Sequence, residues 1–381
     1  MIHYVSADES HGPAQIAIIS GIPAGLKLTA DRVNQELQRR RQGYGRGKRM
    51  RLELDQAVII SGVRNSYTLG SPIALQIINR DYTNWGKYMD SESADMETVR
   101  VSVPRPGHAD LAGVLKYKHD DIRNVSERAS ARETVARTAA GAVAKIFLQD
   151  FGVDIFSHVL QIGSVKAALE DKKPITPENL GTDCHCADPA AEVLMKQAIV
   201  QARNQGDTLG GVFEIIASGA PVGLGSYVEW HRRLDAWLAA AVMSIPGIKG
   251  VEIGEGFATA GLSGNAVHDE VYYRSGRYEH GSNHAGGIEG GMTNGENVIV
   301  RAAMKPIPTL RRPLRSVDIF THEPSIPGPE RADVCAVPAA GVIGESMVAL
   351  VLADAWLEKF GGDSMREIKA RWEAEVEHAE F

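Results

Sequence analysis

The feature that most constrains the fold is a long apolar stretch at residues 334–357, near the C-terminus. A run of this length must either cross a membrane or be buried inside a large protein core. Pro338, Glu345 and Asp354 interrupt it, and charge near the centre of a membrane span is costly. We therefore expect no membrane span here, and we predict a helix over residues 339–360 that ends at the following Gly-Gly pair.

The composition is that of a globular protein able to bury such a helix. The chain has 381 residues, 44% of them hydrophobic and 23% charged, with a formal net charge of -7. This acidic balance argues against a surface that binds nucleic acid throughout, because such binding needs a dominant cationic field. Three cysteines cannot form a disulfide framework, and the N-terminus does not have the pattern of a signal peptide. We therefore expect a cytoplasmic protein.

Helix and strand patterns are about equally frequent along the chain. Capping residues and apolar spacing predict helices over residues 29–43, 130–149, 188–206 and 231–244, and another that starts at Ser364. Alternating apolar residues predict strands over residues 51–54, 73–78, 99–103, 212–216 and 298–303. The strands cluster between helices instead of alternating strictly with them, which favours a mixed α+β fold with antiparallel sheets. No shift in composition marks a domain boundary.

Residues 39–51 read RRRQGYGRGKRMR, with seven Lys or Arg side chains in thirteen positions. The glycines resemble a phosphate-binding loop, but the Walker pattern needs Gly in place of Gln42 and Ser or Thr in place of Arg49. Two interpretations stay open: a solvated basic face or RNA-binding arm, and a cationic loop that closes over a small polyanion. Guanidinium groups suit the second, because their planar fork donates two parallel hydrogen bonds. We expect this loop to be mobile when empty, because its charges repel one another.

Two histidines lie in loops beside other polar residues. His11 belongs to ESHG at 9–12, and His108 belongs to RPGHAD at 105–110. A lone histidine is more often structural. A histidine beside Ser or Arg in a glycine-flanked loop can also exchange protons near neutral pH, so both interpretations stay open.

Three further segments have a structural and a functional interpretation. Ser130 fits a helix N-cap, and the free amides there, flanked by Arg128 and Arg132, also suit an anion. The glycine-rich residues 281–295 fit a plain loop or a backbone that approaches a flat ligand. Cys184-His185-Cys186 is too tightly spaced for a usual zinc site, so we expect no metal.

Taken together, these segments resemble the chorismate synthase family. The matching stretches run almost from end to end: ESHG at 9–12, RRRQGYGR at 39–46, RPGHAD at 105–110, KY at 116–117, ERASARETVARTAAGAVAK at 127–145, VEIGEGF at 251–257, SNHAGGIEGGMTNGENVIVRAAMKPIPT at 282–309 and ERADVCAVPAAGVIGESMVALVLADAWLEKFGGDS at 330–364. The resemblance implies a single domain over residues 1–381, a β-α-β sandwich with helices layered between two antiparallel sheets. It also implies a homotetramer.

The resemblance implies a lyase activity as well. The reaction is the anti-1,4 elimination of phosphate from 5-enolpyruvylshikimate 3-phosphate to give chorismate, in the shikimate pathway of aromatic amino acid biosynthesis. The family requires reduced FMN, although there is no net redox change. A substrate with two carboxylates and a phosphate must lie against a second phosphorylated molecule, so many cations are needed to offset the repulsion.

Carried over residue by residue, the resemblance implies that His11 protonates the departing phosphate and that His108 protonates or hydrogen-bonds the reduced flavin. Asp333 would help to take the C6 proton, with support from Ser10 and Ser130. The substrate anions would be held by Arg40, Arg49, Arg105, Arg132 and Arg331. The flavin contacts would come from Arg128, Ala129, Ser130, Gly247, Gly291, Lys305, Pro306, Ile307, Pro308, Thr309 and Arg331. Arg40 and Arg46 also match positions that the family assigns to NADP.

The sequence departs from the family pattern at two places near these residues. Asp8 stands where glycine is usual and adds a carboxylate close to an anionic substrate. The sequence leaves open whether its side chain points away or pairs with an arginine. Pro246-Gly247 stands where Asn-Ala is usual, so a flavin contact there could come only from the backbone.

Two functions from other classes serve as alternatives. A nucleic-acid-binding protein would use the arginines of residues 39–51, although the net charge counts against it. An FMN- or NADP-dependent oxidoreductase would oxidise pyridine nucleotide without the enolpyruvyl substrate. We see no insertion that suggests an intrinsic flavin reductase, so we expect an external flavin reductase to supply the reduced FMN, with NADPH as a source of reductant. We expect neither nucleic acid nor a membrane as a partner.

Overall fold

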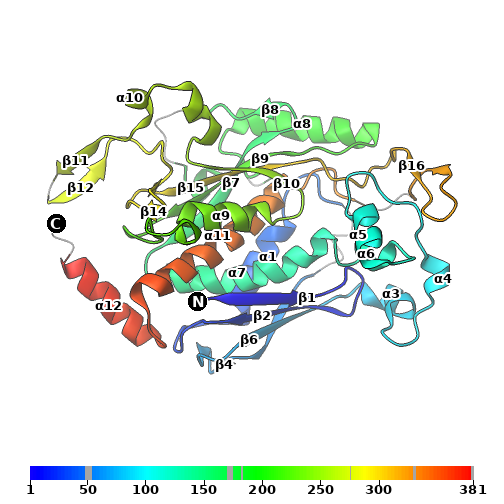
Figure 1. Ribbon diagram of the computed structural model, residues 1–381, viewed down its shortest axis with the longest axis horizontal. Helices are drawn as coiled ribbons and strands as arrows, with labels where there is room; N and C mark the ends of the chain where they lie inside the picture. The colour runs from blue at the N-terminus through cyan, green and yellow to red at the C-terminus, as the bar shows by residue number, and fades with distance from the viewer. Residues whose placement is uncertain (48–53, 170–174, 182, 275, 329–331, 379–381) are drawn as a thin grey trace.

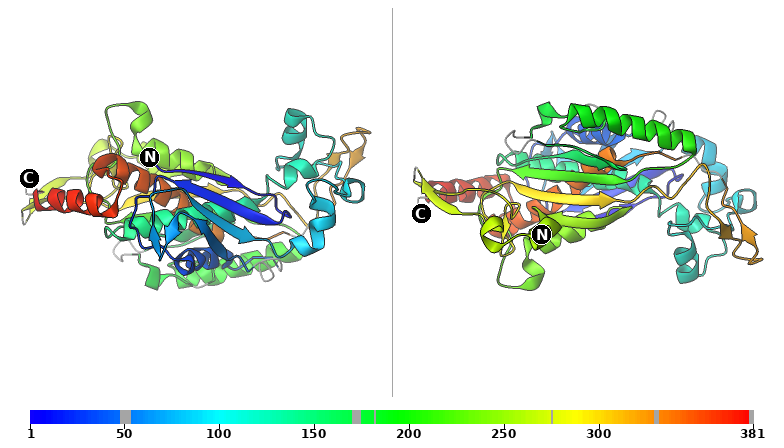
Figure 2. Two further views of the ribbon diagram at one scale, coloured as in Figure 1. Left: turned by 90° about the horizontal axis from the view of Figure 1, so that it is seen from below. Right: turned by 90° about the horizontal axis from the view of Figure 1, so that it is seen from above.

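The structure is a computed structural model that describes residues 1–47, 54–169, 175–181, 183–274, 276–328 and 332–378. Two antiparallel sheets enclose a layer of helices (Figure 1; Figure 2). In spatial order, the four-stranded sheet consists of β1 (His3–Ala7), β2 (Ala14–Ser20), β6 (Ile73–Ile78) and β3 (Ala57–Ser61). The five-stranded sheet consists of β10 (Ile248–Ile253), β15 (Val298–Met304), β9 (Gly211–Ser218), β7 (Asp154–Ile162) and β8 (Val165–Lys166).

Three helices form the layer between the sheets: α1 (Ala30–Arg41), α7 (Thr134–Gln149) and α11 (Val337–Phe360). The α7 helix packs against β2 and β6, and α11 packs against β7 and β9. Two further helices flank the five-stranded sheet. α9 (Leu234–Met243) packs against β10, and α8 (Pro189–Gln205) packs against β7 and β8. The fold is therefore mixed α+β with antiparallel sheets, as the sequence pattern predicts, and helices lie between the two sheets, as the family resemblance implies.

The shorter elements gather mainly at the two ends of the sandwich (Figure 1). One end holds α3 (Tyr82–Met89), α4 (Met96–Val99), α5 (Asp110–Tyr117), α6 (Arg123–Ser126) and the hairpin of β16 (Ser316–Val317) and β17 (Pro324–Ser325). The other end holds α10 (Gly264–Val267), α12 (Met365–His378), the hairpin of β11 (Val271–Arg274) and β12 (Arg277–His280), and the hairpin of β13 (Ile288–Glu289) and β14 (Met292–Thr293). A further hairpin joins β4 (Val63–Arg64) and β5 (Tyr67–Thr68), and short 3₁₀ turns include η1 (Ala131–Glu133).

The α11 helix contains most of the long apolar stretch. It is long and apolar enough to cross a membrane, yet 83% of its most apolar window is buried inside the protein. Glycines let its backbone approach both neighbours closely. A Cβ on Gly141 of α7 would lie 2.2 Å from the Ser346 side chain, and one on Gly344 of α11 would lie 2.6 Å from the Ile215 side chain of β9. The stretch therefore forms the core helix of this sandwich.

A carboxylate is buried at the middle of this core helix. Glu345 is fully buried and accepts two hydrogen bonds from the Arg39 guanidinium, at 2.6 and 2.8 Å. It also accepts one from Lys145 Nζ at 2.7 Å and one from Ser157 Oγ at 2.7 Å. Glu36 accepts from both Arg39 and Lys145, so two carboxylates balance two cations. These side chains tie α1, α7, α11 and β7 together.

The predicted helix boundaries are largely confirmed. Thr29 caps α1 by accepting a hydrogen bond from the amide of Arg32. Asp188 caps α8, which ends at Gly206 in a left-handed conformation. Ser364 and Glu367 exchange hydrogen bonds at the start of α12, which is the predicted capping box.

The predicted strand over residues 99–103 is wrong. The Asp121 carboxylate accepts a hydrogen bond from the Val101 amide, and the Ile122 amide donates to the Val101 carbonyl. The Ile319 amide donates to the carbonyl of Ser102. Loop residues thus provide the hydrogen-bond partners of this backbone. An alternating apolar pattern does not by itself supply the neighbouring strand that a sheet needs. Most of the predicted strand over residues 51–54 lies outside the described residues.

We expect Glu345→Gln to lower the free energy of unfolding by about 3–5 kcal/mol, because it leaves buried cations short of a carboxylate. Burial alone would raise the pKa of the Glu345 carboxyl, but Lys145 and Arg39 hold it below its ordinary value of 4.5. A lowered pKa stabilises the folded state above that value, so the difference from wild type should shrink as the pH falls below about 4.5. Urea denaturation at several pH values measures both effects.

The matched control is Glu358→Gln in the same helix. Glu358 pairs with Arg232 at the surface, so Glu358→Gln should lower the free energy of unfolding by less than about 1 kcal/mol. An equal decrease in the free energy of unfolding for the two variants at neutral pH would contradict a stabilising role for the buried cluster.

Candidate active site

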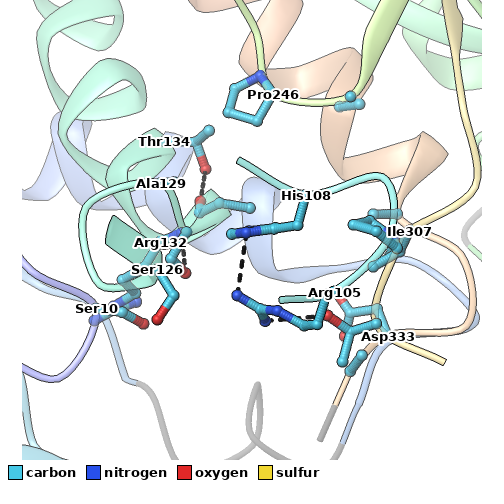
Figure 3. Close-up of a pocket in the computed structure, with 18 of the residues that line it drawn as sticks. Ser10, Arg105, His108, Ser126, Ala129, Arg132, Thr134, Pro246, Ile307 and Asp333 are labelled. Atoms are coloured by element: carbon cyan, nitrogen blue, oxygen red, sulfur yellow. Dashed lines mark hydrogen bonds between the residues drawn. The ribbon is translucent and has the colours of Figure 1, made fainter. Parts of the chain in front are cut away.

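A cavity of about 880 Å³ lies where the first turns of α7 and α11 meet the loops after α1, α9 and β15. Figure 3 shows His108 and Arg105 between Ser10 on one side and Asp333 on the other. Small-ligand sites span roughly 300–1,000 Å³, so this cavity lies at the large end of that range.

Positive charge dominates the cavity wall. Within the described ranges, two carboxylates, Glu127 and Asp333, line it together with seven Lys or Arg side chains. The seven are Arg40, Arg46, Arg105, Arg123, Arg132, Lys305 and Arg311. Charges attract a ligand more strongly in a partly buried site than in water. The cavity therefore suits a ligand, or a pair of ligands, with several negative groups.

One part of the wall is apolar. The loop after α9 contributes Ile245 and Pro246, the segment after β15 contributes Ile307, and α11 contributes Ile343. Such a surface suits the flat face of an aromatic ring, while the cations suit its anionic substituents. Among the described residues, no group of three or more His, Cys, Asp or Glu side chains is arranged to hold a metal ion.

His108 belongs to a compact charged cluster. Its Nδ1 lies 2.5 Å from Asp110 Oδ1, and Arg105 donates to Asp110 through Nε at 2.8 Å and Nη2 at 3.1 Å. Burial would raise the pKa of the Asp110 carboxyl, but the hydrogen bonds from His108 and Arg105 hold it well below its usual range. Asp110 therefore stays ionised and orients both the imidazole and the guanidinium at the cavity wall.

Arg40 and Arg132 share a buried acidic partner. Arg132 donates to Asp55 Oδ2 at 2.9 Å and lies 2.7 Å from Oδ1, and Arg40 lies 3.6 Å from Asp55 Oδ2. Arg40 also donates to Thr134 Oγ1, from Nε at 3.0 Å and from Nη2 at 2.8 Å. One carboxylate thus orients two guanidinium groups whose residues line the cavity.

Asp333 lies just before α11 and faces the loop after α1. Arg46 Nη1 lies 2.7 Å from its Oδ2, and the Gly47 amide donates to its Oδ1 at 2.5 Å. Ser130 caps η1 at the start of α7 by accepting from the Arg132 amide, so the structural interpretation of this serine is confirmed. Its place in the cavity wall is compatible with a second role.

Most of the residues that the resemblance assigns to the site line this one cavity. They are Ser10, His11, Arg40, Arg46, Arg105, His108, Ala129, Ser130, Arg132, Gly247, Lys305, Pro306, Ile307, Pro308, Thr309 and Asp333. Two others lie elsewhere in this chain. Gly291 accepts a hydrogen bond from the Leu234 amide at the start of α9, and the Arg128 side chain pairs with Asp8 and is not part of the cavity wall. Arg49 and Arg331 lie outside the described residues, as does much of the arginine-rich loop.

The Asp8 side chain, which the sequence left unplaced, pairs with Arg128. Arg128 donates to Asp8 Oδ1 at 2.8 Å and to Ser6 Oγ at 3.0 Å. Asp8 is buried, and burial raises the pKa of its carboxyl, which the Arg128 charge partly offsets. The extra carboxylate is therefore paired with an arginine and does not line the cavity.

Sequence reasoning missed the carboxylates that hold the functional side chains. Asp110 and Glu127 fall inside quoted stretches, RPGHAD and ERASARE, yet neither received a role. The spacing of His108 and Asp110 could have indicated the contact, because side chains two residues apart in a turn can meet. Asp55 and Glu127 contact partners far along the chain, and no local pattern predicts such pairs.

Comparisons with known proteins agree with this geometry. The family model described as chorismate synthase matches residues 2–357. The chorismate synthase of Geobacter sulfurreducens is 54% identical over 392 aligned positions, covering 99% of each chain, and that of Desulforamulus reducens is 53% identical, covering 97% of each. A crystal structure of chorismate synthase superposes with a TM-score of 0.79 at 41% identity, covering all of this chain and 98% of the other. The chain therefore belongs to the chorismate synthase family.

Proposed function

We propose that the cavity binds reduced FMN together with 5-enolpyruvylshikimate 3-phosphate and carries out the anti-1,4 elimination that gives chorismate. The C3–O bond breaks, phosphate leaves with the bonding electrons, a base takes the C6 proton, and a second ring double bond forms. The observation that carries this proposal is a single wall that combines excess positive charge with His11, His108 and Asp333. The family of the chain performs this lyase reaction.

The arginines of this chain bind and orient the substrate anions. Arg40, Arg105 and Arg132 are each held by hydrogen bonds to side chains of the protein, so little conformational freedom is lost when an anion arrives. Each also pairs with a carboxylate of the protein, Arg105 with Asp110 and the other two with Asp55. Arg49 and Arg331 are proposed to complete the set.

The residues present fit a reduced flavin. The apolar wall formed by Ile245, Pro246, Ile307 and Ile343 suits an isoalloxazine ring, and Lys305 lies nearby for its phosphate. Reduced FMN, when bound, supplies electron density to the breaking C–O bond. The segment 305–309, the residues Ala129 and Ser130 and the backbone of Gly247 would hold it. We extend the same role to Arg128, through its backbone, and to Gly291 and Arg331.

Three side chains move or hold protons in this scheme. His11 donates a proton to the departing phosphate, and His108, oriented by Asp110, would protonate or hydrogen-bond a bound reduced flavin. Asp333 takes part in removing the C6 proton, with support from Ser10 and Ser130, which line the same cavity. A general acid or base of this kind contributes typically ~10²–10⁴-fold to a rate.

Several conditions of the reaction are part of this proposal. The chain acts as one domain in the cytoplasm and receives reduced FMN from an external reductase, with NADPH as the source of reductant. Arg40 and Arg46 would be the NADP contacts if pyridine nucleotide enters the same site.

We expect purified protein with chemically reduced FMN, kept anaerobic, to release phosphate from the enolpyruvyl substrate. His11→Ala and Asp333→Ala should each lower kcat by about 10²–10⁴-fold, because each removes a proton-transfer group. His3→Ala is the matched control, since His3 is exposed on β1 outside the cavity. Absence of turnover by the wild-type protein under reducing conditions would refute the proposed function.

We also propose a homotetramer, supported by an apolar face on the four-stranded sheet. Val5, Ile16, Ile18, Val58 and Ile78 lie in its strands, and each is at least 37% exposed. The strands pair so that Val5 is opposite Ile18, which in turn is opposite Ala74 of β6. A contiguous exposed apolar face of this kind marks a protein interface, and a second copy of the chain is its proposed partner.

We expect Ile18→Glu to break this assembly, because the charge would be buried at the centre of the interface. Light scattering after size-exclusion chromatography should show a smaller species for the variant. Leu194→Glu, which places the same charge at an exposed position of α8, should keep the wild-type size. A monomeric wild-type protein, or a tetrameric Ile18→Glu variant, would count against this interface.

A further inference from the structure

A buried carboxylate contacts His11 at three points. The His11 amide donates to Glu127 Oε2 at 2.8 Å, and His11 Nδ1 lies 2.9 Å from Oε1 and 3.0 Å from Oε2. The Ser10 amide donates to the Glu127 carbonyl at 2.9 Å. The Glu127 side chain is only 4% exposed. Glu127 therefore fixes both the backbone that carries His11 and the orientation of its ring.

The ionisation state of Glu127 determines which ring nitrogen carries hydrogen. Burial would raise the pKa of the Glu127 carboxyl, but the hydrogen bonds from His11 and the nearby charge of Arg123 hold it below its usual range. An ionised carboxylate only accepts hydrogen bonds, so His11 Nδ1 must be the donor. The other ring nitrogen, Nε2, points away from Glu127, and no hydrogen bond occupies it within the described part of the chain.

Two further side chains restrict the position of this pair. Arg123 Nη1 donates to Glu127 Oε1 at 3.2 Å, and Arg123 Nε donates to the Val99 carbonyl at 2.9 Å. The Arg123 guanidinium lies 5.0 Å from the Trp85 ring centroid, and the Trp85 ring lies 4.1 Å from the His11 ring. The imidazole is thus held at its edge by Glu127 and at its face by Trp85.

We propose that Glu127 is the positioning residue for His11: it holds the Nδ1–H tautomer and presents Nε2 to the cavity as the atom that donates a proton to the departing phosphate. This proposal rests on the role given to His11 above. The charged groups that contact the ring or its carboxylate partner are Glu127 and Arg123, from α6 and the residue after it. Without Glu127 the ring would face the Arg123 cation alone, which disfavours the imidazolium form.

The first test compares Glu127→Gln, Glu127→Asp and the charge-matched control Glu9→Gln. Glu9 is exposed and does not line the cavity. In the anaerobic phosphate-release assay we expect Glu127→Gln to lower kcat by about 10–100-fold with little change in KM, as for other groups that orient a histidine. The alkaline limb of its kcat–pH profile should move to lower pH. Glu127→Asp, which keeps the acceptor, should recover part of the rate, and Glu9→Gln should behave as wild type.

The second test does not depend on activity. In ¹⁵N-histidine-labelled protein, the His11 resonances are assigned by their loss in His11→Ala. We expect a fixed Nδ1–H tautomer in wild type and in Glu127→Asp, and a mixture of tautomers in Glu127→Gln, whose amide can donate as well as accept. If Glu127→Gln does not fold, the spectra of wild type and of Glu127→Asp still show whether Nδ1 of His11 carries the hydrogen.

The outcomes separate the two proposals. A full rate in His11→Ala would refute the role of His11 as the acid, whatever Glu127 does. A slow His11→Ala variant, combined with wild-type kcat and pH profile in Glu127→Gln, would overturn the positioning role alone. A neutral wild-type His11 ring whose single hydrogen lies on Nε2 would also overturn it.

Discussion

The arrangement of the whole molecule depends on one buried ionic cluster, the Glu345 carboxylate with its partners Arg39 and Lys145. An ionised carboxylate inside a protein core is stable only when it is fully paired. Its partners come from α1 and α7, so the pairing holds three central helices in one relative position. The cavity is built at the ends of those same helices: Arg40 lies in the last turn of α1 next to Arg39, and Asp333 precedes α11. The core cluster thus determines where the functional side chains lie.

The balance of positive and negative side chains differs between the cavity wall and the core. The core cluster pairs two carboxylates with two cations, whereas the described part of the cavity wall has seven Lys or Arg side chains and two carboxylates. The remaining positive charge is what a phosphorylated, carboxylated ligand requires. The net charge of -7 therefore describes the chain as a whole and hides a local site of opposite sign. Each proposed proton donor also has a carboxylate of its own, which fixes its geometry before a ligand binds.

Features with local physical causes could be predicted from the sequence. The apolar stretch at 334–357 had to become a core helix once its charges excluded a membrane span, and capping residues such as Thr29 determined where helices begin. The strand over 99–103 failed because Asp121, distant from it in sequence, takes the amide that a neighbouring strand would have used. The positions of the site residues came from family resemblance, since no spacing brings His11 and Glu127 together. The Asp8–Arg128 pair likewise depends on tertiary structure alone.

The central claim is that both anions bind in this one cavity with the phosphate of the substrate at His11. A crystal structure of the protein with FMN and the enolpyruvyl substrate tests it most directly. The account predicts the flavin ring against Ile307 and Ile343, and a phosphate oxygen within hydrogen-bond distance of His11 Nε2. A ligand bound elsewhere on the chain would contradict the account, as would a phosphate contacted by other groups while His11 Nε2 faces away.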